Sequence, residues 1–395
     1  MLRFRKPGSA DYYDYNLIAV IILLIGFGLV MLYSTSAYRA GIRYNNDMYF
    51  FTKQARYAVL AVIIAIVLSL ADYHILWGMA NALYVLSIIL LLLVRLTPLG
   101  RTINGARRWI AIGPVSFQAA EVSKIAVIVF VPMLITAMGR KFRGMKALLP
   151  PAIAGGIQAL AVYILTSNLS TAVIICIITA TVIFVAHPDT RKLLLIGAGI
   201  LAIGAAAVAI VAISGGNGGF RSMRILVWLH PEEYSSEGGY QIMQALYALG
   251  SGGFFGKGLG NSMQKLGAVP EAENDMIFSI ICEELGIFGG IIVVLLFLYL
   301  LYRLFFIAQN APDLFGSLMV IGIFAHIASQ VILNIAVVLA VIPTTGITLP
   351  FVSYGGTSVF LLMAEMAIAL SVSGSIRFRS VERDLWGEYG AREEF

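Results

Sequence analysis

Asp275 is the strongest candidate for acid–base chemistry, because it stands between an acidic segment and an apolar run. It follows the sequence PEAEN (residues 270–274) and precedes Met276-Ile277-Phe278. A carboxylate in a partly dehydrated cavity has a raised pKa, in the range that suits a general base, whereas a nearby Lys or Arg lowers that pKa. An aspartate that caps a helix N-terminus would fit the same position. Both interpretations stay open on these residues alone.

A second set of candidates lies in residues 101–124, which read RTINGARRWIAIGPVSFQAAEVSK. Here Arg108 directly precedes Trp109. Guanidinium groups bind phosphate through paired hydrogen bonds, and tryptophan favours the membrane interface. The pattern therefore suits a ligand with an anionic head and an apolar tail. Arginines that reach around helix ends toward the membrane surface would explain the same residues without a ligand.

Glu121 and Lys124 follow at the start of an apolar run, three residues apart. On a helix this spacing places both side chains on one face, where they can form an ion pair. Ionisable groups inside a membrane span usually face the bundle interior or an aqueous cavity, because exposure to lipid is costly. We predict that both contribute to a binding site, with a purely structural ion pair as the alternative.

Residues 214–284 are rich in glycine and carry charges of both signs. The stretch around Lys257 is not a phosphate-binding loop of the G-x-x-x-x-G-K-[ST] type, because Ser251 stands at its first glycine and Gly258 follows the lysine. We interpret the segment as a flexible platform. Arg224 and Lys265 are its candidates for binding a substrate.

Polar residues recur near the end of the chain. Gln330 and Asn334 are four apart in an apolar run, and we expect them to form hydrogen bonds across helices. Residues 342–358, IPTTGITLPFVSYGGTS, combine prolines, glycines and hydroxyls, which predicts an irregular re-entrant segment. Such backbone is tolerated at membrane depth only when it is buried in protein or lines a wet cavity. Ser353 and Tyr354 are therefore predicted to border the same cavity as Asp275.

The elements that position these residues are membrane spans. The chain has 395 residues, of which 59% are hydrophobic and 12% charged, whereas a soluble domain carries about 25% charged residues. About 20 mostly apolar residues cross a bilayer. We predict an all-α polytopic membrane protein with ten spans, one domain over residues 1–395, a large loop at 214–284 between spans seven and eight, and a tail at 374–395. The spans are predicted at residues 17–36, 54–71, 75–95, 119–138, 149–166, 170–186, 193–213, 285–307, 315–341 and 351–373.

The distribution of basic residues predicts orientation. Ten spans put both termini on one side, together with the basic clusters at 3–6, 140–146, 191–192 and 377–379. The positive-inside rule makes that side cytoplasmic, so the basic residues of 101–108 and 221–265 lie outside. The formal net charge is +6, and its placement between apolar runs favours anionic membrane lipids and phosphorylated lipids as partners rather than nucleic acid.

Three blocks of this sequence resemble the SEDS family. RRWIAIGPVSFQAAEVSK resembles its R-W-I-x-x-G-x-x-x-x-Q-P-S-E-x-x-K pattern, GLGNSMQKLGAVPEAENDMIFSIICEELG its large outer loop, and PTTGITLPFVSYGGTS its final signature. The G-N-S-x-Q-K and P-E-A forms are more similar to the division-type FtsW and sporulation branches than to the elongation-type RodA branch.

The resemblance implies a peptidoglycan glycosyltransferase with ten helices. Such an enzyme polymerises lipid II at the outer face of the cytoplasmic membrane and works with a class B penicillin-binding protein, which crosslinks the product. The family's essential loop carboxylate corresponds to Asp275, and residues of the first block correspond to Arg108, Glu121 and Lys124. This sequence departs from the family at Asn168, where an aspartate is common, so a second carboxylate role there is in doubt.

The implied reaction inverts C1 of the donor MurNAc and releases undecaprenyl pyrophosphate. Asp275 would accept a proton from the 4-hydroxyl of the acceptor GlcNAc, and Arg108, Lys124 and Arg224 would stabilise the leaving group. A divalent cation on the pyrophosphate is compatible with this chemistry, but no carboxylate cluster in the sequence would fix one. A lipid II flippase is the alternative function, and a scaffold that recruits the penicillin-binding protein is a third.

Overall fold

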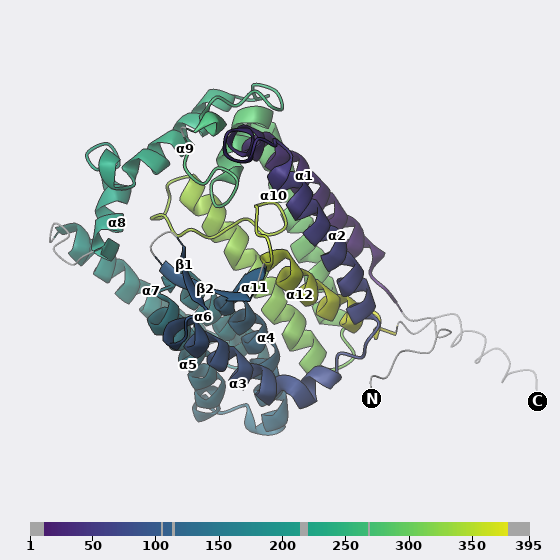
Figure 1. The fold of residues 1–395 in the computed structure, drawn as a ribbon. Coiled ribbons are helices and arrows are strands. Elements are labelled where there is room, and N and C mark those ends of the chain that lie inside the picture. The colour runs from purple at the N-terminus through teal and green to yellow at the C-terminus, as the bar shows by residue number, and fades with distance from the viewer. Residues whose placement is uncertain (1–11, 104–105, 113–114, 214–219, 268, 378–395) are drawn as a thin grey trace, which may run out of the picture.

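The computed structural model describes residues 12–377, apart from residues 104–105, 113–114, 214–219 and 268. It is a bundle of long helices with a small sheet and further short helices at one end (Figure 1). In chain order the helices and strands are α1 (Tyr15–Tyr44), α2 (Tyr49–Ser69), α3 (Ile75–Leu96), β1 (Gly100–Ile103), β2 (Ala106–Ile112), β3 (Val115–Gln118), α4 (Ala119–Met138), α5 (Leu149–Thr166), α6 (Leu169–Ala186), α7 (Thr190–Ile213), α8 (Phe220–Leu229), α9 (Gly239–Gly252), α10 (Ile277–Asn310), α11 (Leu314–Val338) and α12 (Ser358–Ser373).

Within the described ranges, nine helices are long and apolar enough to cross a membrane. The shorter α12 is also apolar, with 16 residues. These ten helices follow the ten predicted spans in order, so the prediction of an all-α polytopic membrane fold is confirmed. The prediction for the last span is wrong at its start, because helix begins at Ser358 and residues 351–357 belong to the irregular segment before it.

Some helices of the bundle are enclosed by the others, and some expose apolar side chains on its outer surface. α4 and α11 lie at its centre and are the most enclosed of the candidate spans. α2 instead presents a row of exposed apolar side chains, including Leu60, Ile63 and Val67. An outward apolar surface of this kind is suited to lipid, and the helices that carry it satisfy their backbone hydrogen bonds internally.

The two ends of the described chain meet. The backbone N–H of Tyr12 donates to the carbonyl of Ile376 at 3.1 Å, and that of Asp14 donates to Ser373 Oγ at 3.3 Å. Asp14 also caps α1 and forms a buried ion pair with Arg303 of α10 at 2.7 Å. Both ends therefore lie at the same end of the bundle, as an even number of spans requires.

The basic segment after α3 forms a small sheet that the sequence analysis did not predict. β1, β2 and β3 pair in that order and are antiparallel throughout. Trp109 is paired with Arg101 on one side and with Gln118 on the other. The sheet leads directly into α4, and we call the end of the bundle that carries it the sheet end. The hydroxyl of Thr357 donates to the carbonyl of Ser116 at 2.7 Å, which joins β3 to the start of α12.

The large loop predicted at 214–284 is mostly helical where it is described. It contains α8, α9 and the first residues of α10. α10 is broken at Gly286, whose φ of 70° and ψ of −171° are not helical. Gly286 packs against the backbone after α9, and a Cβ there would lie 2.3 Å from the carbonyl oxygen of Phe254. The first part of α10 thus belongs to the sheet end, and the part after Gly286 is the membrane span.

Candidate active site

Asp275 lies in the segment that leads into α10, residues 269–276, which we call the Asp275 loop. The residue is 9% exposed, and its Oδ1 atom accepts no hydrogen bond from the described part of the chain. The helix-capping interpretation is not supported, because the N-cap of α10 is Met276 and no side chain caps it. Burial, and then the charge of Glu271, raise the pKa of Asp275 to about 7, against the lowering effect of Arg224. This carboxyl can exchange a proton near neutral pH.

The Asp275 loop is held by the segment between α11 and α12, residues 339–357, which we call the α11–α12 loop. The Ser353 hydroxyl donates to the carbonyl of Asn274 at 2.6 Å. The Tyr354 N–H donates to the carbonyl of Glu273 at 2.9 Å. The glutamate side chain in turn pairs with Arg39 of α1 at 2.9 Å. The structure thus brings the Ser353 hydroxyl and the Tyr354 backbone to the main chain of the Asp275 loop.

Two amides of α11 fix the same pair of loops. Asn334 Nδ2 donates to the carbonyls of Asp275 and Ile347, at 2.8 and 2.7 Å. Gln330 Nε2 donates to the carbonyl of Thr348 at 3.0 Å. The expected bonds from α11 to other helices are therefore replaced by bonds to loop backbone, because the α11–α12 loop folds back over α11.

Arg224 of α8 also contacts the α11–α12 loop. Its Nη1 donates to the carbonyl of Thr344 in the α11–α12 loop at 3.1 Å. Its charge lowers the pKa of Asp275 and also lowers that of Arg108, so it acts on both groups. Gly346, two residues after Thr344, has a φ of 70°, and a Cβ there would lie 3.9 Å from Asp275 Oδ2. The carboxyl of Asp275 thus lies against this loop.

Arg108 extends from β2 to the end of α5. Its Nη2 donates to the carbonyl of Ser167 at 3.1 Å, and its Nε to that of Thr166 at 3.3 Å. Burial and the neighbouring charge of Arg224 lower the pKa of Arg108. Two guanidinium groups whose charges repel each other form a place where an anion would be stabilised.

Asn168, the position where the SEDS family commonly has an aspartate, is the N-cap of α6. Its Oδ1 accepts from the N–H of Thr171 at 3.1 Å. Ser170 then donates to the carbonyl of Thr345 at 2.8 Å, which ties α6 to the α11–α12 loop. Asparagine caps helices as well as aspartate does, so Asn168 provides this cap without a carboxylate.

Glu121 and Lys124 are paired at 2.9 Å across one turn of α4. The ammonium of Lys124 also contacts His326 Nε2 of α11 at 2.8 Å, and His326 Nδ1 contacts Glu365 Oε2 of α12 at 2.7 Å. Neither His326 nor Glu365 was among the site residues predicted from the sequence. Ionisable residues inside apolar spans are a signal for function, and that signal applies to both.

Lys265 lies in a different environment from that predicted. Its ammonium is buried and is bound by Glu284 at 2.7 Å and by Ser34 of α1 at 2.9 Å. Glu283 likewise pairs with Lys257 at 2.7 Å. These contacts attach the segment after α9 to α1 and α10. We therefore assign Lys265 a structural role and leave it out of the proposed site.

A groove on α2 adds two cations to the sheet end. It has a volume of about 380 Å³ and is lined by Tyr49, Thr52, Lys53, Arg56 and Tyr57. The aromatic ring of Phe50, on the same helical turn, contacts Tyr354 edge to face with ring centroids 5.2 Å apart. The groove therefore adjoins the α11–α12 loop. In the sequence, the spacing of three between Lys53 and Arg56, with tyrosines nearby, could have indicated this groove.

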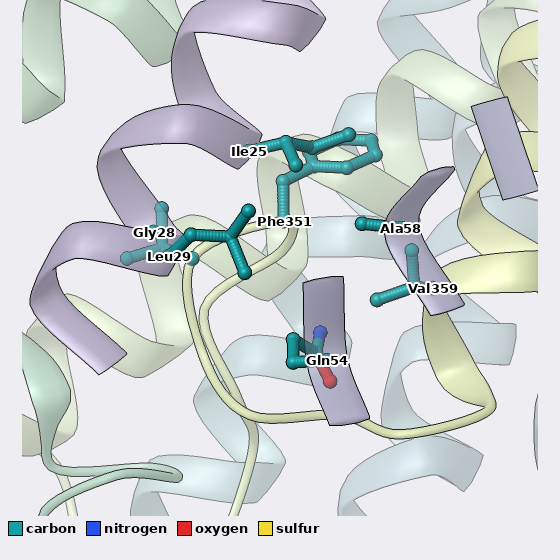
Figure 2. Close-up of a pocket in the computed structure, with 8 residues that line it drawn as sticks. Ile25, Gly28, Leu29, Gln54, Ala58, Phe351 and Val359 are labelled. Carbon is teal, nitrogen blue, oxygen red and sulfur yellow. The ribbon is translucent and has the colours of Figure 1, made fainter. Parts of the chain in front are cut away.

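The α11–α12 loop is also packed firmly against α1 and α2. Figure 2 shows a small apolar cavity between Ile25, Gly28 and Leu29 of α1, Gln54 and Ala58 of α2, and Phe351 and Val359. Gly28 permits this contact, since a Cβ there would lie 2.7 Å from the carbonyl oxygen of Phe351. The side chain of Gln54 accepts from the N–H of Gly356 at 3.2 Å. The cavity is a packing feature and is too small for a substrate.

The fold and site together define the class: a polytopic helical membrane protein whose sheet end holds a buried carboxyl under the charge of Arg224, which in turn neighbours Arg108. Residues 14–377 match the FtsW/RodA/SpoVE family of cell cycle proteins. The chain belongs to this family, which is the one that the resemblance predicted.

Individual relatives agree with this assignment. Stage V sporulation protein E of Bacillus subtilis is 36% identical over 365 residues, which cover 92% of this chain and 98% of that protein. A probable peptidoglycan glycosyltransferase FtsW of Trichlorobacter lovleyi is 34% identical over 373 residues, covering 94% and 96%.

Solved structures show the same fold. A chain from a peptidoglycan synthase complex superimposes with a TM-score of 0.75 at 27% identity, covering 91% of this chain and 97% of that chain. RodA of Thermus thermophilus superimposes with a TM-score of 0.65 at 26% identity, covering 93% and 98%.

Proposed function

We propose that this protein is a peptidoglycan glycosyltransferase that polymerises lipid II into glycan strands at the outer face of the cytoplasmic membrane. The observation that carries this proposal is the buried carboxyl of Asp275, with a pKa raised to about 7, beside Arg224. The names of the FtsW relatives and the polymerisation named for the structural relative support it.

In the proposed reaction Asp275 is the general base. Its carboxylate accepts the proton of the 4-hydroxyl on the terminal GlcNAc of the acceptor as that oxygen attacks C1 of the donor MurNAc. The C1–oxygen bond to pyrophosphate breaks with inversion, and the electron pair leaves with undecaprenyl pyrophosphate. A base with a pKa of about 7 combines a large deprotonated fraction with useful proton affinity at neutral pH.

The cations of the site stabilise the leaving group. Arg108 and Arg224 repel each other in the free protein, and a pyrophosphate between them would relieve that repulsion while its negative charge grows. Lys124 adds a third positive charge from α4, held beside Glu121. We place Lys53 and Arg56 of the α2 groove on the anionic part of a lipid substrate.

The proposed step needs no protein nucleophile. A divalent cation on the pyrophosphate is compatible with it, and the described ranges hold no cluster of three His, Cys, Asp or Glu side chains that would bind one.

The proposed biological setting is supported by the distribution of basic residues and by the names of the relatives. The positive-inside rule places both termini in the cytoplasm and the sheet end outside. A class B penicillin-binding protein is the proposed partner, because the structural relative belongs to a complex that joins polymerisation to crosslinking. Division or sporulation is the proposed process, given the names of the relatives.

Glycan synthesis from labelled lipid II in detergent, with the purified protein and its cognate penicillin-binding protein, tests this function. We expect glycan ladders from the wild type and none from Asp275→Asn. Asp47→Asn is the matched control, because Asp47 is an exposed carboxylate after α1 that bonds Tyr33. Ladders from Asp275→Asn would move the base elsewhere. A wild type that makes no ladders but moves lipid II across proteoliposomes would be a flippase.

A further inference from the structure

Four ionisable side chains from three helices form a chain in the interior of the bundle. Lys124 of α4 stands between Glu121, at 2.9 Å, and His326 of α11, at 2.8 Å. Glu365 of α12 completes the chain at 2.7 Å from His326. Lys124, His326 and Glu365 are at most 2% exposed, so each depends on its neighbours for hydrogen bonds.

With Lys124 charged and His326 neutral, the donors and acceptors of this chain leave one assignment. A charged lysine has three donors and no acceptor, so its contact with His326 requires Nε2 to accept. A neutral imidazole whose Nε2 accepts carries its proton on Nδ1. The carboxylate of Glu365, 2.7 Å from Nδ1, accepts that N–H. The hydrogen bond at one ring nitrogen sets the state of the other, and Glu365 thereby makes His326 an acceptor for Lys124.

A structural ion pair would not need this arrangement. Glu121 lies on the same helix as Lys124 and already supplies the opposite charge. A second acceptor from α11, oriented by a third helix, instead fixes the direction in which the long lysine side chain extends. That restriction is what a group needs if its charge must lie at a set distance from a reacting atom.

The face of α11 that holds Lys124 also holds Asp275. His326, Gln330 and Asn334 follow at intervals of four residues, which places them along one face of the helix. Asn334 binds the carbonyl of Asp275 at 2.8 Å. One rigid helix therefore contacts the lysine at one position and the loop of the proposed base two turns further on.

We propose that His326, oriented by Glu365, is a positioning residue that holds the Lys124 ammonium at a fixed place relative to Asp275. The inference rests on the proposed function, in which Lys124 stabilises the leaving pyrophosphate. The imidazole does not contact the substrate and acts only through Lys124. Loss of the His326 nitrogen that accepts from Lys124 therefore lowers kcat, while KM for lipid II stays near the wild-type value.

The test compares His326→Gln with His326→Leu in the glycan-synthesis assay. The glutamine amide can accept from Lys124 through Oε1 and donate to Glu365 through Nε2, whereas leucine can do neither. We expect kcat to fall about 10- to 100-fold in His326→Leu, as for other misplaced catalytic groups, and to be largely restored in His326→Gln. Equal loss in both variants, or full activity in His326→Leu, would overturn the proposal.

A second measurement detects the contact without any activity. Unfolding midpoints are compared for the wild type, Lys124→Met, His326→Leu and the double variant. We expect the unfolding midpoint of the double variant to fall by less than the sum of the falls in the two single variants. The reason is that each single change leaves a buried polar partner unpaired. Strict additivity would overturn the contact.

The two proposals fail separately. Absence of ladders from the wild type would remove the proposed function, and the unfolding comparison would still decide whether His326 holds Lys124. Ladders from the wild type with full activity in His326→Leu would remove only the positioning role.

Discussion

Asn334 binds the main chain of Asp275 and leaves its carboxyl group untouched. Its amide nitrogen donates to the carbonyls of Asp275 and Ile347, at 2.8 and 2.7 Å, and Asn334 is 1% exposed. Hydrogen bonds in such a low-dielectric environment are strong. The backbone is therefore fixed at Asp275, while the carboxyl of this proposed base is left available for proton transfer.

Replacing Asn334 should reduce both stability and polymerisation. Asn334→Leu leaves two buried carbonyls without a donor, and each such group costs about 1–3 kcal/mol. We expect a lower unfolding midpoint and a slower rate of glycan synthesis. Gln330→Leu is the control, because Gln330 binds only the carbonyl of Thr348. An equal loss of activity in both variants would argue against a specific role at Asp275.

The pH dependence of polymerisation should follow Asp275. Its pKa is raised to about 7, and the base acts as a carboxylate, so kcat/KM should fall about tenfold per pH unit below that value. Glu271 raises this pKa through its charge. Glu271→Gln should therefore move the midpoint of the profile to lower pH. A midpoint that stays in place or moves upward would contradict the assignment.

The raised pKa of Asp275 should also make the free energy of unfolding depend on pH. Between the ordinary value of 3.8 and about 7, folded Asp275 binds more protons than the unfolded chain does, so the free energy of unfolding falls as pH rises through this window. Asp275→Asn removes that dependence. We expect this inactive variant to be more stable than the wild type at pH 8, by about 4 kcal/mol at most, and the difference to vanish near pH 4.

Gly286 should tolerate no side chain. Its φ is 70°, and a Cβ would lie 2.3 Å from the carbonyl oxygen of Phe254 and 2.5 Å from the nitrogen of Gly256. Gly286→Ala should therefore lower the unfolding midpoint and displace the first part of α10, which reduces polymerisation. Gly26→Ala on α1 is the control, since nothing lies within 4 Å of a Cβ there. Wild-type behaviour of Gly286→Ala would show that the kink is dispensable.

The sequence predicted what local pattern and composition determine. The spans follow from apolar runs, and the pair of Glu121 and Lys124 follows from helical spacing. Contacts between distant segments were not predictable in this way. The sheet of residues 100–118 depends on pairing between short strands, and Lys265 is bound by Glu284 and Ser34, the latter 231 residues away.

The same limit applies to the interior network. His326 and Glu365 are isolated ionisable residues in two separate apolar runs, 39 residues apart. Only the packing of α11 against α12 and α4 shows that they share one chain of hydrogen bonds with Lys124. Sequence pattern identifies residues that bear charge, and the fold decides which of them meet.

The break at Gly286 divides α10 into two helical parts that meet at a kink. The part before Gly286 carries Glu283 and Glu284, which are bound to Lys257 and Lys265, and it begins two residues after Asp275. The part after Gly286 is embedded with the other spans. A displacement of the segment around α9 would therefore be transmitted through the first part of α10 to the Asp275 loop, while the part after Gly286 stays packed among the other long helices.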